Sequence, residues 1–360
     1  MRVVVAMSGG VDSSVAAALL AEQGHDVIGL SMQLYPSSGS GQAPEGAAVG
    51  HFGSCCTLDD LNDARRVAHA VGFPHYILNF ERQFQETVIS NFVTQYASGR
   101  TPLPCAHCNS DLKFSTLLDR AHGFGAQYVA TGHYAQVEQA GGRWLLKRSV
   151  DREKDQSYFL FSLTQEQLAS AVFPVGSLTK AQVRHEARRH ALQVAEKPDS
   201  QEICFVPDGD YAAFVARHAR QAVQAGAIVD EGGRWLGAHG GIHRFTVGQR
   251  KGLGISSAAP LYVLQINADS GDVTVGPRSS LDRTTLTASG VNWVAVDAPA
   301  SWVRVAAQIR HRHAPAPGRV REIENGRAEF IFDTPQPAVS PGQAAVFYDG
   351  DVVVGGGWID

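Results

Sequence analysis

Short apolar runs alternate with amphipathic segments through the first half of the chain. The apolar runs have the length and composition of buried strands, which predicts strands at residues 3–7, 26–35, 75–80 and 128–131. Between them, apolar residues recur at helical spacing, which predicts helices at residues 11–23, 58–71, 84–96 and 110–122. Strands that alternate with helices join through right-handed crossovers into a parallel sheet. The first half is therefore predicted to be a doubly wound α/β domain.

The pattern shifts towards strands further along the chain. Alternating segments on either side of Gly141 and Gly142 predict a β-hairpin of residues 134–138 and 144–148. Helical spacing returns at residues 165–172, 180–192 and 210–224. Short alternating segments between Gly, Pro and Asp turns then follow at residues 262–266, 273–276, 303–309, 328–332 and 344–348. This pattern predicts a small domain and then a C-terminal β-barrel.

These changes of pattern suggest three domains. We place the α/β domain at residues 1–206, a small central domain at 207–276 and the β-barrel at 277–360. A chain of 360 residues is long for a single core, which agrees with this division. Residues 37–53 are rich in Gly, Ser, Pro and Ala, which is typical of a flexible loop.

The composition is that of a globular protein, with 44% hydrophobic and 18% charged residues. No apolar run approaches the length of a membrane-spanning helix, and a short strand rather than a signal peptide follows the first two residues. We therefore expect a cytoplasmic location and no membrane partner. Five cysteines, an odd count, argue against a disulfide framework.

The net charge of −4 gives no global sign of a polyanionic partner, so any nucleic-acid binding must come from a local patch. One stretch qualifies, because residues 298–321 contain no Asp or Glu. Its basic residues are Arg304, Arg310, His311, Arg312, His313, Arg319 and Arg321. Clustered positive charge of this kind suits contacts with phosphates.

The segment from Ser8 to Ser14, with the sequence SGGVDSS, joins the first predicted strand to the first predicted helix. Glycines at a helix start bring unpaired N–H groups and the positive end of the helix dipole close to an anion. Asp12 would fix the loop or help to hold a Mg²⁺ that screens phosphates. The spacing is not the GxxxxGK[ST] pattern of P-loop nucleotidases. A bare Ser-Gly-Gly would favour a simple helix cap, but all seven residues after a strand favour a phosphate site.

Three cysteines lie in segments whose sequence allows a chemical role for the thiol. Cys105 and Cys108 form a CxxC after a proline-rich entry, near the start of a predicted helix, where a thiol pKa is lowered. A single CxxC is compatible with a redox pair, half of a metal site or two incidental thiols. Cys204 stands beside Phe205, where a cysteine often serves as a small hydrophobe.

Seven further motifs stand in order along the chain. They are CNSDLKF at 108–114, TGHY at 131–134, KDQSYFL at 154–160, FPVG at 173–176, ICF at 203–205, GQRKGLG at 248–254 and PGQ at 341–343. Together with the SGGVDS loop, which is similar to that of the N-type ATP pyrophosphatases, they closely resemble the bacterial tRNA-specific 2-thiouridylases. The resemblance runs nearly end to end, and it implies an ATP pyrophosphatase (PP-loop) fold for residues 1–206.

The resemblance also implies a reaction. ATP adenylates the C2 oxygen of the wobble uridine of tRNA, and a cysteine persulfide then delivers sulfur and displaces AMP. Cys204 resembles the persulfide carrier, and Cys108 resembles the partner thiol, which forms a disulfide with Cys204 or acts as nucleophile. A second thiolate is needed because a persulfide that has delivered its sulfur must be resolved.

Binding residues follow from the same resemblance. The ATP contacts are Ala6, Met7, Ser8, Gly9, Gly10, Val11, Asp12, Ser13, the backbone of Met32, and Gly132. The tRNA contacts are His133, Lys154, Asp155, Gln156, Arg310, His311 and Gln343, with Leu103, Pro104 and Cys105 near the target base. Several of these residues also have interpretations without a binding role, such as a turn for Gly132, a structural histidine for His133 and a solvated loop for Lys154 to Gln156. The expected partners are Lys, Glu and Gln tRNAs and a sulfur donor such as a cysteine desulfurase or a sulfur-relay protein.

One departure leaves a second sulfur route open. Some members of the family have Asp where this chain has Cys105, so the chain offers three thiolates, Cys105, Cys108 and Cys204. Three thiolates could hold a [4Fe-4S] cluster with one open iron. Cys55 and Cys56 are adjacent, which gives poor disulfide geometry, and we expect a structural role for them.

Two rival functions differ in what they require. Another AMP-forming enzyme of the same class, such as a lysidine or amide-forming synthetase, would need no thiol. A nucleotide-regulated tRNA-binding module would make no product at all.

Overall fold

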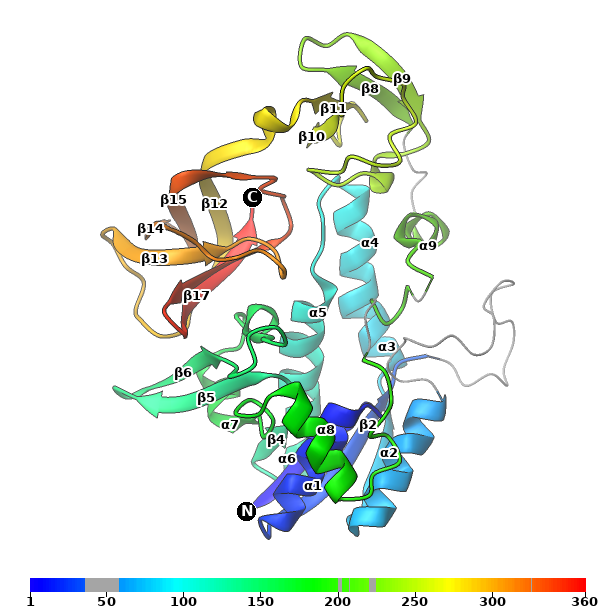
Figure 1. Ribbon diagram of the computed structural model, residues 1–360, viewed down its shortest axis with the longest axis vertical. Helices are drawn as coiled ribbons and strands as arrows, with labels where there is room; N and C mark the ends of the chain where they lie inside the picture. Colours follow the sequence, from blue (N-terminus) through cyan, green and yellow to red (C-terminus); the bar gives the residue numbers. More distant parts are fainter. Residues whose placement is uncertain (36–57, 200–202, 207, 220–224, 325) are drawn as a thin grey trace. The chain divides into compact units, whose positions relative to one another are not determined.

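The computed structural model describes residues 1–35, 58–199, 203–206, 208–219, 225–324 and 326–360 (Figure 1). The flexible loop expected at 37–53 and the adjacent Cys55 and Cys56 lie outside these residues. The chain forms two compact units, one of Met1–Val88 and Cys105–Gly209, the other of Ile89–Pro104 and Asp210–Asp360. The segment Ile89–Pro104 thus groups with the C-terminal half. Its apolar pattern gave no sign of this, because an apolar stripe does not say which neighbour covers it.

The first unit contains a five-stranded sheet in the order β3-β2-β1-β4-β7. Its strands are β1 (Arg2–Ala6), β2 (Asp26–Gln33), β3 (His75–Asn79), β4 (Tyr128–Ala130) and β7 (Ala171–Val172). All neighbouring strands run parallel, so the predicted doubly wound sheet is confirmed. The helix predicted at 165–172 is wrong at its end. Helix α7 (Gln165–Ser170) stops where the backbone becomes extended at Ala171, which begins the edge strand β7.

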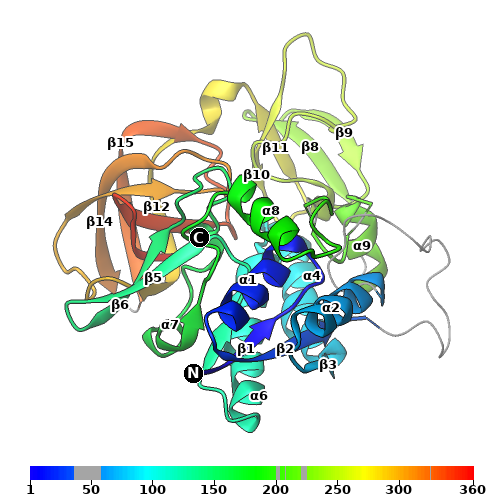
Figure 2. The ribbon, with the colours of Figure 1, turned by 60° about the horizontal axis from the view of Figure 1, so that its bottom comes forward.

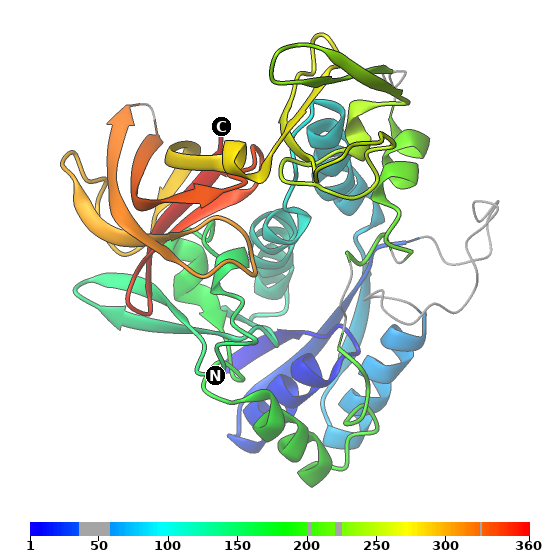
Figure 3. The same ribbon diagram turned by 45° about the horizontal axis from the view of Figure 1, so that its top comes forward.

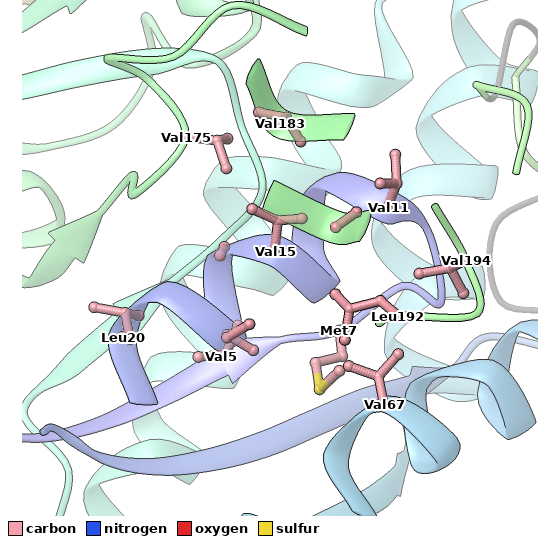
Figure 4. Close-up of a cluster of buried hydrophobic side chains, with 14 of the residues drawn as sticks. Val5, Met7, Val11, Val15, Leu20, Val67, Val175, Val183, Leu192 and Val194 are labelled. Atoms are coloured by element: carbon pink, nitrogen blue, oxygen red, sulfur yellow. The ribbon is translucent and has the colours of Figure 1, made fainter. Parts of the chain in front are cut away.

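Both faces of this sheet are buried. Val3 and Val5 of β1 belong to a core that includes residues of α1 (Val11–Glu22), α2 (Leu58–Val71) and α8 (Lys180–Arg189). Figure 4 shows Val5 and Met7 close to Val15 of α1 and Val67 of α2, and Figure 2 shows α1 and α2 beside β1 and β2. Val4 on the opposite face is also completely buried. A sheet covered on both faces explains why its strands read as continuous apolar runs.

Two predicted helices contain π-helical turns. The helix predicted at 84–96 consists of α3 (Glu81–Phe84), the π-helix η1 (Gln85–Ile89) and α4 (Ser90–Ala97). The helix predicted at 110–122 begins earlier, with α5 (Pro104–His107), and continues as the π-helix η2 (Cys108–Thr116) and α6 (Leu117–Gly123). Proline suits a first helical position, which accounts for the earlier start. The predicted hairpin is confirmed as β5 (Ala135–Ala140) and β6 (Arg143–Arg148), and the 3₁₀ turn η3 (Ser157–Phe159) follows it.

The central part of the second unit is a four-stranded sheet in the order β10-β11-β8-β9. Its strands are β8 (Gly226–Asp230), β9 (Trp235–His239), β10 (Tyr262–Ile266) and β11 (Val273–Gly276), and the 3₁₀ turn η4 (Ile242–Arg244) packs into their core. Helix α9 (Tyr211–His218) is shorter than the predicted 210–224, of which residues 220–224 are not described.

The C-terminal part is a closed barrel, as predicted (Figure 3). After the 3₁₀ turn η5 (Arg278–Leu281), its strands are β12 (Asp282–Trp293), β13 (Val303–Gln308), β14 (Ala316–Glu324), β15 (Arg327–Pro337), β16 (Ala344–Asp349) and β17 (Val352–Ile359). Pairing of β12 with β17 closes it. Strand β17 was not predicted, because it is rich in glycine, a residue that is depleted in strands. A Cβ at Gly355 would lie 2.6 Å from the Asn292 carbonyl oxygen, so glycine allows the closing strands to meet.

Across the described residues, no helix has both the length and the apolar character that a membrane crossing requires.

Candidate nucleotide and thiol site

The glycine loop is shaped by its own serines. Gly9 has a φ of +73°, and a Cβ there would lie 2.2 Å from the Asp60 carbonyl oxygen, so only glycine fits. The Ser13 hydroxyl lies 3.2 Å from the Ser8 backbone nitrogen, and the Ser14 hydroxyl donates to the Gly10 carbonyl at 2.8 Å. Helix α1 begins directly afterwards, with Gly10 as its N-cap. The loop is therefore held in place by internal hydrogen bonds at the positive end of a helix.

Gly132 lies directly against this loop. Strand β4 pairs with β1, and a Cβ at Gly132 would be 2.5 Å from the Ser13 backbone nitrogen. The carboxyl ends of β1 and β4 thus meet, at the place where the strand order reverses direction. In doubly wound sheets this switch point is where ligands bind.

Met32 lies near the end of β2, beyond the last residue paired with β1. The register of the two strands ends at Ala6 and Leu30, after which the Met7 N–H donates to the Leu30 carbonyl at 2.8 Å. The Met32 side chain is 7% exposed and belongs to the core, as its residue type suggested. A nucleotide contact at this position would involve the backbone.

A half-buried histidine of β3 supports the strand that leads into the loop. The Ser31 hydroxyl donates to the Met7 carbonyl at 2.7 Å and lies 2.8 Å from His75 Nε2. Since the hydroxyl has only one proton, His75 must donate from Nε2, and its buried Nδ1 has no partner in the described structure. Burial, with the nearby charge of Arg65, lowers the pKa of His75 from 6.5 to about 4. His75 is therefore neutral in the folded protein at physiological pH.

Because the pKa of His75 is low in the folded protein, we expect a loss of stability in mild acid. The pKa of His75 is lower in the folded state than in the unfolded chain, so its contribution is complete above pH 6.5 and is lost as the pH falls towards 4. We expect the melting temperature to fall between about pH 7.5 and about pH 5, and to fall less in His75→Gln. Thermal melts at the two pH values measure this difference. His69→Gln, an exposed position on α2, is the control; an unchanged pH dependence in His75→Gln would contradict the assignment.

Asp12 is fixed by two neighbours. The Tyr134 hydroxyl donates to Asp12 Oδ1 at 2.8 Å, and Lys180 Nζ lies 2.7 and 2.9 Å from the two carboxylate oxygens. Burial, and then the charge of Asp12, raise the pKa of Tyr134, so its hydroxyl remains a donor. Of the two roles predicted for Asp12, these contacts support fixing the loop. Its carboxylate also has the oxygen chemistry that Mg²⁺ prefers, and it would be the residue to hold the ion.

Asp199, beyond Lys180, forms ion pairs with three basic side chains. It lies 2.7 Å from Lys180, 2.8 Å from Lys154 and 3.3 Å from Arg184. Burial would raise the pKa of Asp199, but hydrogen bonds from Lys154 and Lys180 outweigh it and lower the pKa. Lys154, a predicted tRNA contact, is thus ion-paired in this structure. Lys180 and Asp199 were not predicted as site residues, because nothing in the sequence links positions so far apart.

Lys197 is attached to the glycine loop from another side. Its ammonium group donates to the Gly9 carbonyl at 3.0 Å and to Asp60 and Asp63 of α2, at 2.6 Å each. Burial would lower the pKa of Lys197, but the two carboxylates raise it overall. The loop therefore contacts a permanent cation through its backbone.

The other predicted tRNA contacts of the first unit are mostly engaged within the protein. Asp155 is 8% exposed and accepts from Ser149 N–H and the Ser157 hydroxyl, so it organises its own loop. Gln156 accepts from the Tyr134 N–H at 2.9 Å. His133 lies 2.7 Å from the Thr131 hydroxyl. Burial, and then the charge of Lys113, lower the pKa of His133. It can meet RNA as a neutral hydrogen-bonding group rather than as a cation.

The thiols of the CxxC motif differ in exposure, since Cys105 is exposed and Cys108 is half-buried. Cys108 begins the π-helix η2, a feature often found at functional sites. Its position is one turn inside the helical segment that starts at Pro104, so the expected effect of a helix start on a thiol falls on Cys105. Asn109 fixes η2 by donating to the Phe159 carbonyl at 3.1 Å.

Cys204 is also half-buried. The neighbouring Phe205 ring packs edge-to-face on Phe84 of α3, with ring centroids 5.7 Å apart, and Phe84 packs in the same way on Tyr35, which follows β2. Helix α3 in turn contacts η2, which begins with Cys108. Both thiols therefore belong to segments that border α3, at the carboxyl edge of β2 and β3.

A mononuclear metal site involving these thiols is not seen among the described residues. There, the one group of three potential ligand side chains whose ligand atoms lie within 4.8 Å of one another is Glu22, Glu186 and His190. Arg189 pairs with both of these glutamates, which offsets part of their negative charge.

In the second unit, Arg310 and Gln343 line one pocket of about 490 Å³. Gln343 donates to the carbonyls of Thr101 and Pro102, at 3.1 and 3.2 Å, and so fixes the segment that leads to the buried Leu103 and Pro104. The remaining pocket residues are Thr101, Tyr211, Thr246, Val247, Gly248, Gln249 and Ser340. The structure thus brings two predicted tRNA contacts together. The loop with Arg310 and His311 is held by buried Gln308, which donates to both of their carbonyls.

The rest of the basic stretch is less cationic than its sequence suggested. Arg304 forms a double hydrogen bond with Asp333, at 2.9 and 2.8 Å, and Arg321 pairs with Glu329 at 2.8 Å. Both acids come from β15, which lies outside the acid-free run. A run without acids along the chain is therefore not a surface without acids. Arg310 and the exposed Arg319, which lies over the Trp302 ring, form no ion pair within the part of the chain that the structure describes.

The chain matches three known domain families along its length. Residues 1–208 match the tRNA methyl transferase HUP domain, residues 212–277 the tRNA methyl transferase PRC-barrel domain, and residues 283–359 the aminomethyltransferase beta-barrel domain.

Several curated proteins are similar over their whole length. The tRNA-specific 2-thiouridylase MnmA of Geotalea uraniireducens is 53% identical over 360 residues, which cover 100% of this chain and 95% of that protein. Proteins of the same name from Solibacter usitatus and Geobacter metallireducens are each 52% identical, with 99% and 100% of this chain covered and 99% and 96% of theirs. Among solved structures, NMN synthetase from Francisella tularensis gives a TM-score of 0.34 at 16% identity, over 62% of this chain and 78% of that chain.

Proposed function

Because the chain belongs to the family of tRNA-specific 2-thiouridylases, we propose that it catalyses ATP-dependent 2-thiolation of the wobble uridine of tRNA, with release of AMP and pyrophosphate. The observation that carries the proposal is the conjunction of a glycine loop at the sheet's switch point with two half-buried thiols bordering α3. The domain descriptions name methyl transfer, whereas the full-length relatives name thiolation. We give weight to the relatives, because each of them matches the chain from end to end, whereas each domain family matches one part of it.

The glycine loop would carry out the activation half of the reaction. The uracil C2 oxygen attacks the α-phosphorus of ATP and pyrophosphate leaves, which gives an O-adenylated uridine. The α1 N-terminus and Lys197 behind Gly9 supply positive potential for the phosphates, and Asp12 would hold Mg²⁺. The oxygen then departs as part of AMP rather than as hydroxide, which is a poor leaving group.

The thiols would carry out the sulfur half. The terminal sulfur of a Cys204 persulfide attacks C2, the C–O bond breaks, and AMP leaves. The Cys108 thiolate then attacks Sγ of Cys204, which breaks the sulfur–sulfur bond, releases 2-thiouridine and forms a Cys108–Cys204 disulfide. A dithiol reductant returns the disulfide to two thiols, and a protein that carries a persulfide reloads Cys204. Half-burial of both thiols protects the persulfide from solvent while leaving it reachable.

The alternative to the persulfide route is sulfur transfer through a [4Fe-4S] cluster. Substitution of Cys105 distinguishes the two routes. Under the persulfide route, Cys105→Ala should keep product formation within about threefold, because this exposed side chain only lies near the target base. A [4Fe-4S] cluster would use Cys105 as a ligand, so the same variant would lose both iron and activity. Iron and acid-labile sulfide analysis after anaerobic purification, run beside the product assay, distinguishes the outcomes.

Binding of tRNA is proposed to involve Arg310, His311 and Gln343 in the second unit and the segment from Lys154 to Gln156 in the first. Arg310→Ala is expected to weaken tRNA binding about tenfold and to reduce the slope of log affinity against log salt by about one, since one phosphate contact is lost. Within the described residues its guanidinium has no ion pair, whereas Arg304 is paired with Asp333. Arg304→Ala is therefore the matched control. Equal effects of the two substitutions in a salt titration would contradict the assignment of Arg310.

The proposed function is tested by product analysis. The purified protein is incubated with ATP, Mg²⁺, a persulfide donor and unmodified tRNA, and the digested nucleosides are separated and weighed. We expect 2-thiouridine in an ATP-dependent amount, at the wobble position of Lys, Glu or Gln tRNA. A folded protein that releases pyrophosphate but yields a different nucleoside would support another AMP-forming reaction. Binding of tRNA without any product would support a binding module.

A further inference from the structure

The pocket of about 490 Å³ in the second unit is lined by a side chain that offers a hydrogen-bond acceptor of fixed orientation. Both N–H groups of the Gln343 side chain are used, because they donate to the carbonyls of Thr101 and Pro102. These contacts determine which end of the amide is nitrogen, and so leave Oε1 as an acceptor. Within the part of the chain that the structure describes, Oε1 has no hydrogen-bond partner. An acceptor of this kind suits an N–H or O–H group of a ligand.

Arg310 adds a cationic group to the same pocket. Its backbone is fixed, because its carbonyl accepts from the His313 N–H at 3.0 Å and from the side chain of Gln308 at 3.2 Å. Its guanidinium is half-buried and forms no ion pair with any of the residues described. A guanidinium on a fixed backbone, without a carboxylate beside it, is suited to a phosphate group of a ligand.

Tyr211, the first residue of α9, supplies an aromatic wall. Its ring stacks on that of Tyr96 in α4, with centroids 4.7 Å apart and an interplanar angle of 21°, and Tyr96 packs on Phe92 at 5.0 Å. The Tyr211 hydroxyl donates to the Arg244 carbonyl at 3.3 Å. The ring is therefore held both by a stacked neighbour and by its hydroxyl. Nucleobases stack on aromatic side chains that are presented in this way.

Left-handed backbone gives the pocket its shape. Gly248 has a φ of +89°, and a Cβ there would lie 2.7 Å from the Cβ of Ala338. Ala338 itself has a φ of +54°, which is uncommon for a residue other than glycine. The Ser340 hydroxyl donates to the Val247 carbonyl at 3.3 Å, which joins the two segments. Strained conformations of this kind persist where the surrounding structure fixes them, and they cluster at ligand sites.

We propose that this pocket binds a second nucleotide of the tRNA loop that carries the target uridine, and that it selects a base with a ring N–H group, uracil or guanine. The inference rests on the proposed function. Tyr211 stacks on the base, Gln343 accepts the ring N–H, and Arg310 contacts the phosphate. Cytosine and adenine have a ring-nitrogen acceptor in place of that N–H, so they would set two acceptors against each other. The segment held by Gln343 leads directly into Leu103 and Pro104, where we expect the target base, so the second nucleotide is expected near the target in the loop.

The base preference is tested by binding measurements that need neither ATP nor a sulfur donor. Anticodon stem-loops with a normal target uridine carry uridine, 3-methyluridine or cytidine at one neighbouring position at a time, and their affinity for the full chain is measured by fluorescence anisotropy. At one position, uridine is expected to bind about tenfold more tightly than the other two, because both lack the ring N–H. Equal affinities at every position would overturn the proposal.

Variants then assign the preference to the pocket. In Gln343→Met the preference for uridine over cytidine is lost, because the acceptor is gone, whereas a merely structural role would weaken both RNAs equally. Tyr211→Leu weakens both about tenfold and keeps their ratio, since stacking does not depend on the hydrogen-bonding edge of the base. It serves if Gln343→Met does not fold. A thermal melt of each variant checks folding.

Trp235→Leu is the matched control. Trp235 is an aromatic residue of β9 in the same unit, 65% exposed, and it does not line the pocket. It should keep both the affinity and the preference. A preference that persists in folded Gln343→Met, or an unchanged affinity in folded Tyr211→Leu, would overturn the proposal. The proposed function fails separately, if the unaltered protein forms no 2-thiouridine from whole tRNA.

Discussion

Replacing Cys204 by serine is expected to abolish 2-thiouridine formation, by a factor of at least about 1,000, while tRNA-dependent release of pyrophosphate stays within about threefold of normal. The reason is that a serine oxygen cannot carry a persulfide, whereas the glycine loop that would perform adenylation does not use the thiol. Nucleoside analysis and a pyrophosphate assay on the same samples measure the two halves separately.

The corresponding change at Cys108 has a different expected outcome. Cys108→Ser should still accept sulfur on Cys204, seen as the mass of one added sulfur atom, but should stop before release of product. Loss of the added sulfur mass as well as the product in Cys108→Ser would mean that Cys108 is needed to load sulfur onto Cys204, rather than to resolve the persulfide. Normal product formation by Cys204→Ser would contradict the assignment of the carrier and would favour a synthetase that needs no thiol.

The second large effect is expected at Gly132. In Gly132→Ala the new methyl group would lie 2.5 Å from the Ser13 backbone nitrogen, so the glycine loop or the end of β4 must move. We expect ATP-dependent pyrophosphate release to fall at least about 100-fold, because the loop's geometry is what binds phosphate. The accompanying loss of stability should be about 1–3 kcal/mol, as for other overpacked sites.

The control for this substitution is Gly123→Ala. A Cβ at Gly123, at the end of α6, has nothing within 4 Å, and its backbone is not left-handed. Its stability should stay within about 0.5 kcal/mol of the unaltered protein, and its ATP titration should be normal. Calorimetric titration of ATP and thermal melts cover both variants. Normal ATP affinity in Gly132→Ala would show that this contact does not shape the loop.

Much of the first unit could be predicted because its sheet is buried on both faces. A strand such as β1, with Val3, Val4 and Val5 all buried, leaves a continuous apolar run in the sequence. Strand β17 left no such signal, because Gly355 and Gly357 serve close contact with β12 rather than burial of side chains. The π-helical turns were also invisible, since one additional residue in a turn hardly changes the apolar spacing.

The candidate site divides in a similar way. The glycine loop could be found because backbone geometry there demands glycine, which is visible in the sequence, whereas Gly132 was assigned to the site through the family resemblance. Lys180 and Asp199 could not be found, because an ion pair between distant positions has no local pattern. The basic stretch failed for the related reason that Asp333 and Glu329, which neutralise part of it, come from another strand. Charge along the chain indicates a surface only after the pairing of strands is known.

The central claim is that the glycine loop activates the uridine C2 oxygen and the thiols replace it. The most direct test is a single turnover with a tRNA anticodon stem-loop whose wobble uridine carries oxygen-18 at C2, followed by mass spectrometry of the AMP. Transfer of the label to AMP, in an amount equal to the 2-thiouridine formed, is the predicted result. Unlabelled AMP accompanied by 2-thiouridine would contradict the claim, since the oxygen would then have left without being adenylated.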